Sequence, residues 1–437
     1  MVGYAMCIRS FGETIRMYVI LLLSAAIVLF HASPCVAAVI PPAPGRFVDM
    51  PPSTDHGRPK IFVVDGIPKV AWPFYDPVSE ERRLMFYDGV DVMLVPSAPS
   101  GFGEYFVTVE GDWIAWSTDN SGRVQLWSQA QESALVLSTT GWKASMDGGT
   151  VAWGEAGADR FKVYRQQTGT FTTVDLPTST SLQGIRVTGD LVYFTTYSPA
   201  ERGIYVFDGI STIKVDSTTR WNDDVWAVDG GNILYLKPES SSTDAVYMWS
   251  YDTGESRVVC DTGNFKYNLR FRDGKAIWID WTWGSLKLYY YDGVSCSEII
   301  SPDGRSALHD GSKVEMHDGL IVWDLYRGWG WHEIMLYDLA RGQMYRVTDD
   351  DISDSGAQVH SGWIAWYTLE GIRLFEYVPL PLIGDLNLDG VIDFADLVIL
   401  SSKYGLMQYH VEFEGVFDLN DDGMVDLYDL VMLARMI

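Results

Sequence analysis

Two twelve-residue stretches near the C-terminal end carry oxygen-bearing side chains at matching positions. They read DLNLDGVIDFAD at residues 385–396 and DLNDDGMVDLYD at residues 418–429. Positions 1, 3, 5, 9 and 12 of each stretch hold Asp or Asn, and position 6 is Gly. Alternate residues of a tight loop can turn their oxygens toward one point, and Ca²⁺ takes six to eight oxygen ligands. The spacing therefore predicts two calcium sites, with Gly at the sharpest point of each turn.

The expected ligands follow the numbering of the loop. We expect Asp385, Asn387, Asp389, the carbonyl of Val391, Asp393 and Asp396 to bind one ion. The second set is Asp418, Asn420, Asp422, the carbonyl of Met424, Asp426 and Asp429. This spacing resembles the loop of an EF-hand, although position 12 is Asp where an EF-hand usually has Glu.

The residues around each loop make the resemblance narrower. An apolar helical pattern follows each loop, DLVIL from Asp396 and DLVML from Asp429, whereas the prolines of VPLPLIG rule out a helix before the first. A duplicated loop-plus-helix unit resembles a type I dockerin, over residues 384–437 only. The resemblance implies a small all-α, EF-hand-like domain that binds two calcium ions and docks to a cohesin domain on a partner protein.

The partner of such a domain is chosen partly by loop positions 10 and 11. Dockerins of cellulose-degrading complexes commonly have Ser-Thr there, whereas this chain has Phe394-Ala395 and Leu427-Tyr428. The resemblance assigns these four residues to partner binding. Because they are apolar and differ between the two halves, the sequence leaves open which cohesin is bound.

The middle of the chain repeats itself between about residues 60 and 378. Each repeat has an apolar strand, a turn with Gly, and a second strand that ends in a large aromatic residue; the aromatics are Trp72, Trp116, Trp153, Phe194, Tyr235, Trp278, Trp323 and Trp366. A period near 42 residues with turn signals is typical of one four-stranded sheet per repeat. We therefore expect an all-β domain, a β-propeller of about eight four-stranded blades, with seven as the alternative.

The ends of this domain suggest how the ring closes. The last repeat stops after its third strand, IRLFEYV, and residues 45–50, GRFVDM, precede the first full repeat. We expect GRFVDM to supply the missing fourth strand, which removes a free sheet edge. The recurrence of the short motifs YDG and VAW also resembles the TolB-like propellers of secreted prokaryotic proteins. This resemblance implies the fold and no particular activity.

Catalytic motifs are absent from the propeller sequence, which has no HExxH, GxSxG, Walker loop or CxxC. Propeller glycosidases and lyases use carboxylates from separate blades, and a sequence cannot pair these across space. The sequences WTWG and YRGWGWHE contain more aromatic residues than the packing of a core requires. They predict carbohydrate binding by Trp281, Trp283, Trp329 and Trp331, from loops after the second strand at equivalent places in adjacent blades. The alternative is packing over the mouth of the central channel.

The N-terminus predicts a secreted protein. Arg9 and Arg16 precede the apolar run of residues 17–30, and small residues follow, so residues 1–38 are expected to be a cleaved signal peptide that leaves no membrane span. A retained N-terminal anchor is the alternative. Cys260 and Cys296 remain in the mature chain, and we expect buried thiols in preference to a disulfide because strands at different repeat offsets splay apart.

These observations define a domain order and three functional hypotheses. The expected segments are a signal peptide (1–38), a propeller (45–378), a Pro-containing linker (379–383) and the dockerin-like domain (384–437). The net charge is −26 and no basic patch stands out, which disfavours nucleic acid as a partner; the negative charge favours neutral over acidic polysaccharides, unless calcium bridges them. The protein is expected to be a non-catalytic carbohydrate- or protein-binding component in extracellular polysaccharide breakdown. The alternatives are a glycoside hydrolase or polysaccharide lyase, and a structural surface protein.

Overall fold

The computed structural model describes residues 40–437 with several short gaps. The gaps are 49, 51–56, 77–80, 97–104, 119–121, 132, 156–158, 178–179, 199–201, 218–225, 241–242, 283–284, 301–307, 309–311, 329–330, 380–382, 388–391 and 411. The expected signal peptide therefore lies outside the described residues.

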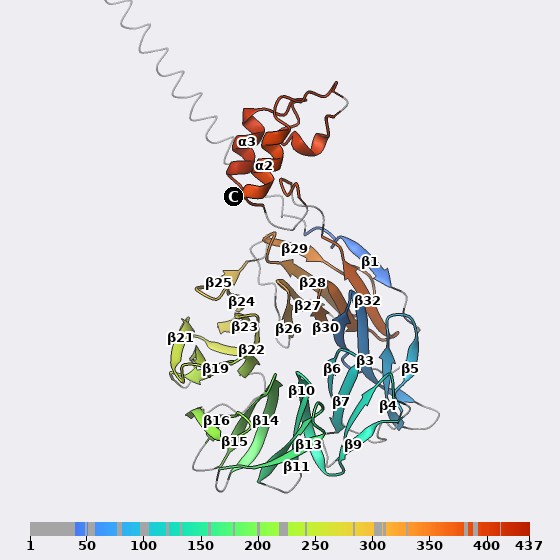
Figure 1. Ribbon diagram of the computed structural model, residues 1–437, viewed down its shortest axis with the longest axis vertical. Helices are drawn as coiled ribbons and strands as arrows, with labels where there is room; N and C mark the ends of the chain where they lie inside the picture. The colour runs from blue at the N-terminus through green and yellow to red at the C-terminus, as the bar shows by residue number, and fades with distance from the viewer. Residues whose placement is uncertain are drawn as a thin grey trace, which may run out of the picture. The chain divides into compact units, whose positions relative to one another are not determined.

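The strands of the described residues form eight antiparallel sheets of four strands each. The sheets are arranged around a common axis (Figure 1), and the first strands of neighbouring blades lie next to one another all the way round it. The chain therefore contains an eight-bladed β-propeller, which confirms the larger of the two expected blade counts.

The blades follow the order of the chain. Blades one to four contain β2 (Lys60–Val64), β3 (Ile67–Asp76), β4 (Glu81–Tyr87) and β5 (Val92–Leu94); β6 (Tyr105–Glu110), β7 (Trp113–Thr118), β8 (Val124–Ser128) and β9 (Leu135–Ser138); β10 (Gly141–Asp147), β11 (Thr150–Glu155), β12 (Arg160–Arg165) and β13 (Thr170–Asp175); β14 (Ser181–Thr188), β15 (Leu191–Tyr197), β16 (Arg202–Phe207) and β17 (Thr212–Ser217).

Blades five to eight contain β18 (Trp226–Asp229), β19 (Asn232–Pro238), β20 (Asp244–Ser250) and β21 (Ser256–Asp261); β22 (Phe265–Arg272), β23 (Lys275–Thr282), β24 (Ser285–Tyr291) and β25 (Cys296–Ile299); β26 (Val314–His317), β27 (Leu320–Gly328), β28 (Trp331–Asp338) and β29 (Gln343–Arg346); β30 (Ser355–His360), β31 (Trp363–Tyr367), β32 (Ile372–Tyr377) and β1 (Gly45–Val48).

The repeated aromatic residues form the contacts between blades. All eight lie on the second strand of their blade and are at most 1% exposed. Trp116 of the second blade, for example, packs with Ala71 and Phe86 of the first. Large flat rings fill the wedge between twisted sheets, which explains why the sequence repeats them once per blade.

Several Asp-Gly pairs make tight hairpin turns between the first and second strands of a blade. Asp65 and Gly66 both have positive φ, 50° and 78°, and the pair Asp273 and Gly274 has 51° and 72°. These values are typical of the two-residue hairpin turn that favours Asp-Gly. The pairs are therefore turn residues, as the sequence indicates.

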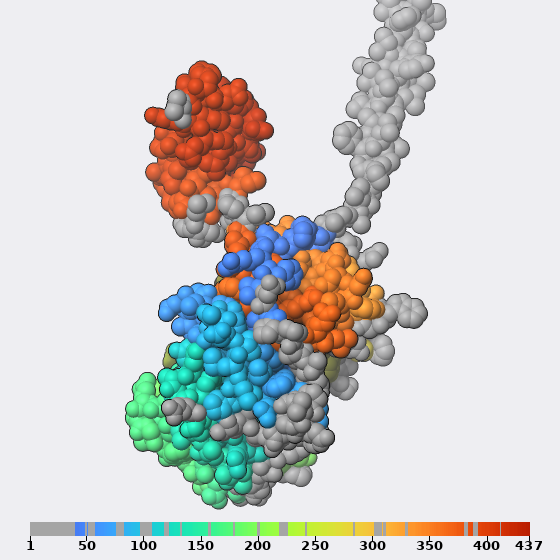
Figure 2. All heavy atoms as spheres, turned by 90° about the vertical axis from the view of Figure 1, so that its right-hand side faces the viewer, coloured from blue at the N-terminus to red at the C-terminus, as the bar shows by residue number. Residues whose placement is uncertain are grey.

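The ring closes by pairing strands from the two ends of the propeller. β1 pairs antiparallel with β32, with Gly45 opposite Tyr377 and Phe47 opposite Phe375. The space-filling view shows these N-terminal residues, in blue, beside the last strands, in orange (Figure 2). The expected closure by residues 45–50 is confirmed over Gly45–Val48, and it gives the last blade its fourth strand by pairing the edge of β32.

The expectation of free thiols is wrong. Cys260 on β21 and Cys296 on β25 form a disulfide, with their Cα atoms 6.2 Å apart. Both residues lie on the outermost strands of neighbouring blades. Because they stand at different positions within their repeats, the sequence alone suggests that the two side chains lie far apart. The inclination of the two blades nevertheless brings this one pair of positions within bonding distance.

The C-terminal part is helical. α2 (Phe394–Ser402) and α3 (Leu427–Ala434) pack against each other, and a short 3₁₀ helix, η2 (Gly415–Phe417), precedes the second loop (Figure 1). Leu400, Phe417, Val425 and Leu433 form the buried centre of this part. No helix in the described part of the chain has the length and apolar character needed to cross a bilayer.

Candidate functional site

The two C-terminal helices begin inside the predicted loops. Both start at loop position 10, and the Asp at position 9 forms the N-cap: Asp393 accepts from the N–H of Ala395, and Asp426 from that of Tyr428. Position 12 completes a capping box in each case. Sequence analysis expected ligands at positions 9 and 12 and missed this second role, which the spacing Asp-x-x-Asp before an apolar run could have indicated.

The two position-12 carboxylates have matching surroundings. Asp396 accepts hydrogen bonds from the N–H groups of Leu386, Asn387 and Asp393 at 2.7, 3.2 and 2.8 Å. Asp429 accepts from Leu419, Asn420 and Asp426 at 2.7, 3.3 and 2.7 Å. Both side chains are fully buried. Each carboxylate thus ties the start of its loop to the start of its helix.

Burial alone would raise the pKa of Asp396. The N–H groups of Asp393, Leu386 and Asn387 outweigh that effect and hold the pKa below its usual value. This side chain therefore stays ionised, as a calcium ligand must.

The second loop has a backbone suited to a tightly turned ion site. Asp421 and Gly423, at positions 4 and 6, have φ values of 57° and 88°. Gly tolerates that conformation at no steric cost, and Asp is among the residues that adopt it most readily. The Asp418 carboxylate accepts from the N–H groups of Asp422 and Gly423 at 3.1 and 2.7 Å, which holds the loop closed.

The expected ligands can be placed only in part. In the first loop, Asp385 is buried and Asn387 is exposed, whereas Asp389 and Val391 lie outside the described residues. The second loop is described throughout, and four of its carboxylates accept hydrogen bonds from backbone N–H groups, those of Asp418, Asp422, Asp426 and Asp429. Over the described residues, no three acidic, His or Cys side chains converge as a metal cluster.

The donor set still fits calcium in its chemistry. A carboxylate has about four lone-pair sites, and the described hydrogen bonds use two of those on Asp418 and three of those on Asp429. Hard carboxylate and amide oxygens are the donors that calcium prefers. The carboxylates of Asp418 and Asp429 can therefore accept hydrogen bonds from backbone N–H groups and bind a cation at the same time.

The four residues expected to contact a partner lie on the surface. Phe394, Leu427 and Tyr428 are 69%, 62% and 71% exposed, and Ala395 is exposed as well. One helical turn later, Val398 and Val431 are also exposed. Each helix therefore presents an apolar stripe to solvent, opposite the face that packs Leu400 or Leu433 into the core.

The propeller tryptophans differ from expectation in position. Trp281 and Trp331 are 37% and 44% exposed, but Trp281 lies within β23 and Trp331 begins β28, so neither is in a loop. The residue of blade seven equivalent to Trp281 is Tyr326, three residues after Trp323 and 42% exposed. The expected equivalence with Trp331 is therefore wrong, because Trp331 stands on the third strand opposite Gly328. Trp283 and Trp329 lie outside the described residues.

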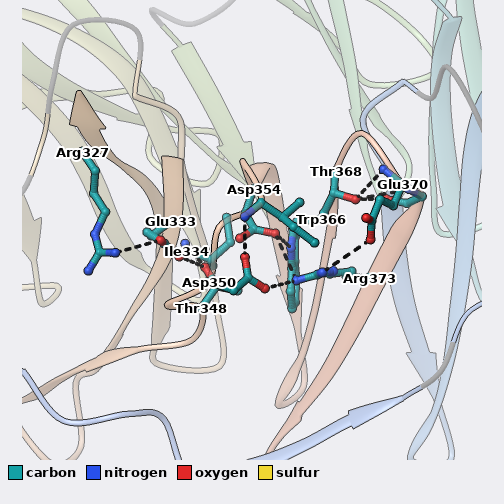
Figure 3. Close-up of polar contacts among 12 residues, drawn as sticks. Arg327, Glu333, Ile334, Thr348, Asp350, Asp354, Trp366, Thr368, Glu370 and Arg373 are labelled. Atoms are coloured by element: carbon teal, nitrogen blue, oxygen red, sulfur yellow. Dashed lines mark hydrogen bonds and ion pairs between the residues drawn. The ribbon is translucent and has the colours of Figure 1, made fainter. Parts of the chain in front are cut away.

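Two buried carboxyl groups lie between blades seven and eight. Thr348 donates to Glu333 at 2.7 Å, and Trp366 donates its indole N–H to Asp354 at 2.6 Å (Figure 3). Burial raises the pKa of Asp354 to about 7 and raises that of Glu333. A raised pKa suits an acid catalyst, but Asp354 and Glu333 are only 0% and 2% exposed. The pair instead anchors the connection from β29 to β30 beneath the surface.

Comparison with known families identifies the C-terminal part. Residues 383–437 match the family model described as the dockerin type I domain, which confirms the resemblance over this segment. No curated protein matches the chain in sequence.

Solved structures resemble the propeller. The structure titled "Structure of Dos1 propeller" has a TM-score of 0.52 and 9% identity, and the match covers 74% of this chain and 94% of that one. The β-propeller domain of the Trilobed protease from Pyrococcus furiosus has a TM-score of 0.44 and 15% identity, covering 70% and 99%. An acylaminoacyl peptidase from Pyrococcus horikoshii has a TM-score of 0.42 and 14% identity. The match covers 74% of this chain and 57% of that one, so this chain spans little more than half of that enzyme. At these identities, the Dos1 likeness supports the propeller fold alone.

Proposed function

We propose that this protein is a secreted component of an extracellular polysaccharide-degrading assembly. Its C-terminal domain docks to a cohesin-bearing partner, and its propeller binds carbohydrate. The observation that carries the proposal is the dockerin type I match over residues 383–437, joined to exposed apolar residues at both pairs of partner-contact positions. The proposed boundaries are those expected from the sequence, with a signal peptide at 1–38, the propeller at 45–378, the linker at 379–383 and the dockerin domain at 384–437.

Calcium is proposed to stabilise the docking domain. Two ions would be bound by the side chains and carbonyls expected from the sequence, one per loop. The cation would offset the mutual repulsion of the loop carboxylates, whose positions the backbone N–H groups already restrict. At free calcium a thousandfold above the dissociation constant, binding adds about 4 kcal/mol to folding.

Hydrogen exchange of the full-length protein tests this linkage. Peptides from residues 384–437 should exchange slowly in millimolar calcium and quickly in chelator, while propeller peptides serve as an internal control. Equal protection of the tail under both conditions would overturn the proposed role of calcium.

The propeller is proposed to bind neutral polysaccharide through aromatic side chains on blades six and seven. Trp281 and Tyr326 occupy the same register of adjacent blades and are both exposed, and Trp331 lies one strand further along blade seven. Sugar rings stack their C–H faces on such aromatic surfaces, and the net charge of −26 disfavours acidic chains on the outer surface.

A pull-down of the full-length protein on insoluble neutral glycans tests the carbohydrate proposal. Retention on at least one glycan is expected, in calcium and in chelator alike, because the aromatics lie in the propeller. Failure on every glycan would remove this part of the proposal and leave docking untouched.

Secretion is supported by two features of the chain. The N-terminal 38 residues have the pattern of a signal peptide. The Cys260–Cys296 disulfide is a type of bond that persists in oxidising, extracellular surroundings.

A further inference from the structure

The first strands of the eight blades place one residue each at the same height around the propeller axis. In every blade, this residue pairs with the one directly before the repeated aromatic. The eight positions, which we call the axial ring, are Lys60, Thr108, Ser145, Arg186, Ala227, Arg270, Glu315 and Gln358. The innermost place of these strands brings the ring residues toward a common axis (Figure 1).

Long charged side chains cross the ring from blade to blade. Arg270 of blade six donates to Glu315 of blade seven at 2.9 and 3.1 Å. Arg58, two residues before Lys60, donates to the same carboxylate at 2.9 Å. Arg58 just precedes the first strand of blade one, whereas Glu315 lies on blade seven. The contact between them therefore crosses the inner edge of blade eight. Lys60 donates to Gln358 at 3.2 Å.

The cluster carries an excess of positive charge. Lys60 lies within electrostatic range of three other cations, Arg58, Arg186 and Arg270. Glu315 is the one ring residue with a carboxylate. Although burial would raise its pKa, Arg270 and Arg58 hold the pKa of Glu315 well below its usual range, so it is ionised. A further acid, Asp324, also interacts with Arg58; burial raises its pKa, and its carboxylate accepts hydrogen bonds from the N–H groups of Gly356 and Ala357.

Repulsion among the cations is visible in Lys60. Burial, followed by the charge of Arg58, lowers the pKa of this side chain to about 8; Arg270 and Arg186 act in the same direction, and Glu315 compensates only in part. Water still reaches the cluster, since the side chains of Arg58, Arg270 and Glu315 are 26%, 20% and 17% exposed. Over the described residues, the buried Nε of Arg58 also lacks a hydrogen-bond acceptor. A hydrated group of cations that outnumbers its ionised carboxylates favours a bound anion.

We propose that the axial ring binds a small oxyanion, a carboxylate or phosphate group of a ligand, through Lys60, Arg186 and Arg270. Arginine and lysine are the side chains that recognise such oxygens by charge-assisted hydrogen bonds. The site is opposite in sign to the chain as a whole, which has a net charge of −26. It therefore concentrates anions that the outer surface repels. This site is independent of docking and of the exposed aromatics.

Titration calorimetry of the full-length protein tests the proposal with two probes, inorganic phosphate and D-glucuronate, each against chloride at equal ionic strength. At least one probe should bind saturably with one site per chain. A response to phosphate alone identifies a phosphate ligand, and a response to glucuronate identifies a carboxylate. No saturable binding of either probe to the wild type overturns the proposal.

Two substitutions of opposite expected sign test the location of the site. Lys60→Gln removes a charged donor and should weaken binding about tenfold, whereas Glu315→Gln removes the competing carboxylate and should tighten it. Lys275→Gln, at an exposed cation that begins β23, is the matched control and should change nothing. Tryptophan fluorescence checks that each variant is folded. If folded Lys60→Gln and Glu315→Gln both bind like the control, the anion is held elsewhere and the proposal is wrong.

Discussion

Cys260 and Cys296 join the outermost strands of blades five and six, across 36 residues of sequence. The bond adds a covalent link where neighbouring sheets are furthest from the axis. All 17 tryptophans lie between Trp72 and Trp366, so tryptophan fluorescence reports on the propeller alone.

Removing this bond should destabilise the propeller. In the chain-entropy model, closing a loop of this length contributes about 4 kcal/mol. Denaturant unfolding followed by tryptophan fluorescence should therefore show a lower free energy of unfolding for Cys260→Ser with Cys296→Ser than for wild type. Reductant should lower wild-type stability and leave the double variant unchanged. If reductant affects both equally, the bond does not form in solution.

Acid should destabilise the propeller through two stacked histidines. The rings of His317 and His360 lie 3.7 Å apart between centroids, and both side chains are buried. Burial, followed by His317 and Arg272, lowers the pKa of His360 to about 3, whereas an unfolded histidine has a pKa near 6.5. The unfolded state therefore binds more protons between these values, and stability falls as the pH drops below about 6.5.

His360→Gln isolates that contribution. The wild type should lose about 2 kcal/mol from this residue between pH 7.5 and pH 5, and the variant should lose correspondingly less in urea unfolding followed by tryptophan fluorescence. His410→Gln, at an exposed residue of the tail, is the control and should follow the wild type. An equal pH slope in wild type and His360→Gln would show that this histidine is not kept neutral by folding.

Asp396→Asn and Asp429→Asn should loosen the docking domain to the same extent. In each case, an amide nitrogen would replace one of two oxygens that accept backbone N–H groups, at a cost of about 1–3 kcal/mol for an unsatisfied buried group. Hydrogen exchange of tail peptides in chelator measures this cost without the contribution of calcium.

Asp421→Asn is the matched control, because Asp421 is exposed and Asn tolerates its positive φ. Protection of the tail should survive this change. If Asp429→Asn exchanges no faster than Asp421→Asn, the described hydrogen bonds do not stabilise the loop.

Substitution of the exposed tryptophans should weaken glycan retention. Stacking contributes about 0.5–1.5 kcal/mol per aromatic contact, so Trp281→Ala and Trp331→Ala should each weaken binding about three- to tenfold on any neutral glycan that retains the wild type. Phe171→Ala, on the outermost strand of blade three and 54% exposed, controls for loss of an exposed ring. Equal loss in all three variants would point to general hydrophobic adsorption.

The sequence predicts those features that recur at a fixed spacing. Trp116 and Trp153 mark their blades because each blade contact needs a large ring at one register, and Gly45–Val48 closes the ring because one strand is missing at the other end. Phe394 and Leu427 could be assigned to the surface because their loops are duplicated.

Features that depend on the inclination of blades could not be predicted. Cys260 and Cys296 meet through the angle between two sheets, which leaves no periodic signal. The axial ring was missed for a similar reason. Lys60, Arg270 and Glu315 belong to different repeats, and only the strand register reveals that they share one height.

The most direct test of the docking account is a calcium-dependent binding titration against a panel of type I cohesin domains. The full-length protein should bind at least one member in millimolar calcium and none in chelator. Asp385→Ala with Asp418→Ala should abolish binding by opening both loops, whereas Phe394→Ser should change which member is preferred while calcium still protects the tail. Binding that survives in the double variant, or a calcium-ordered tail that binds no member of the panel, would contradict the account.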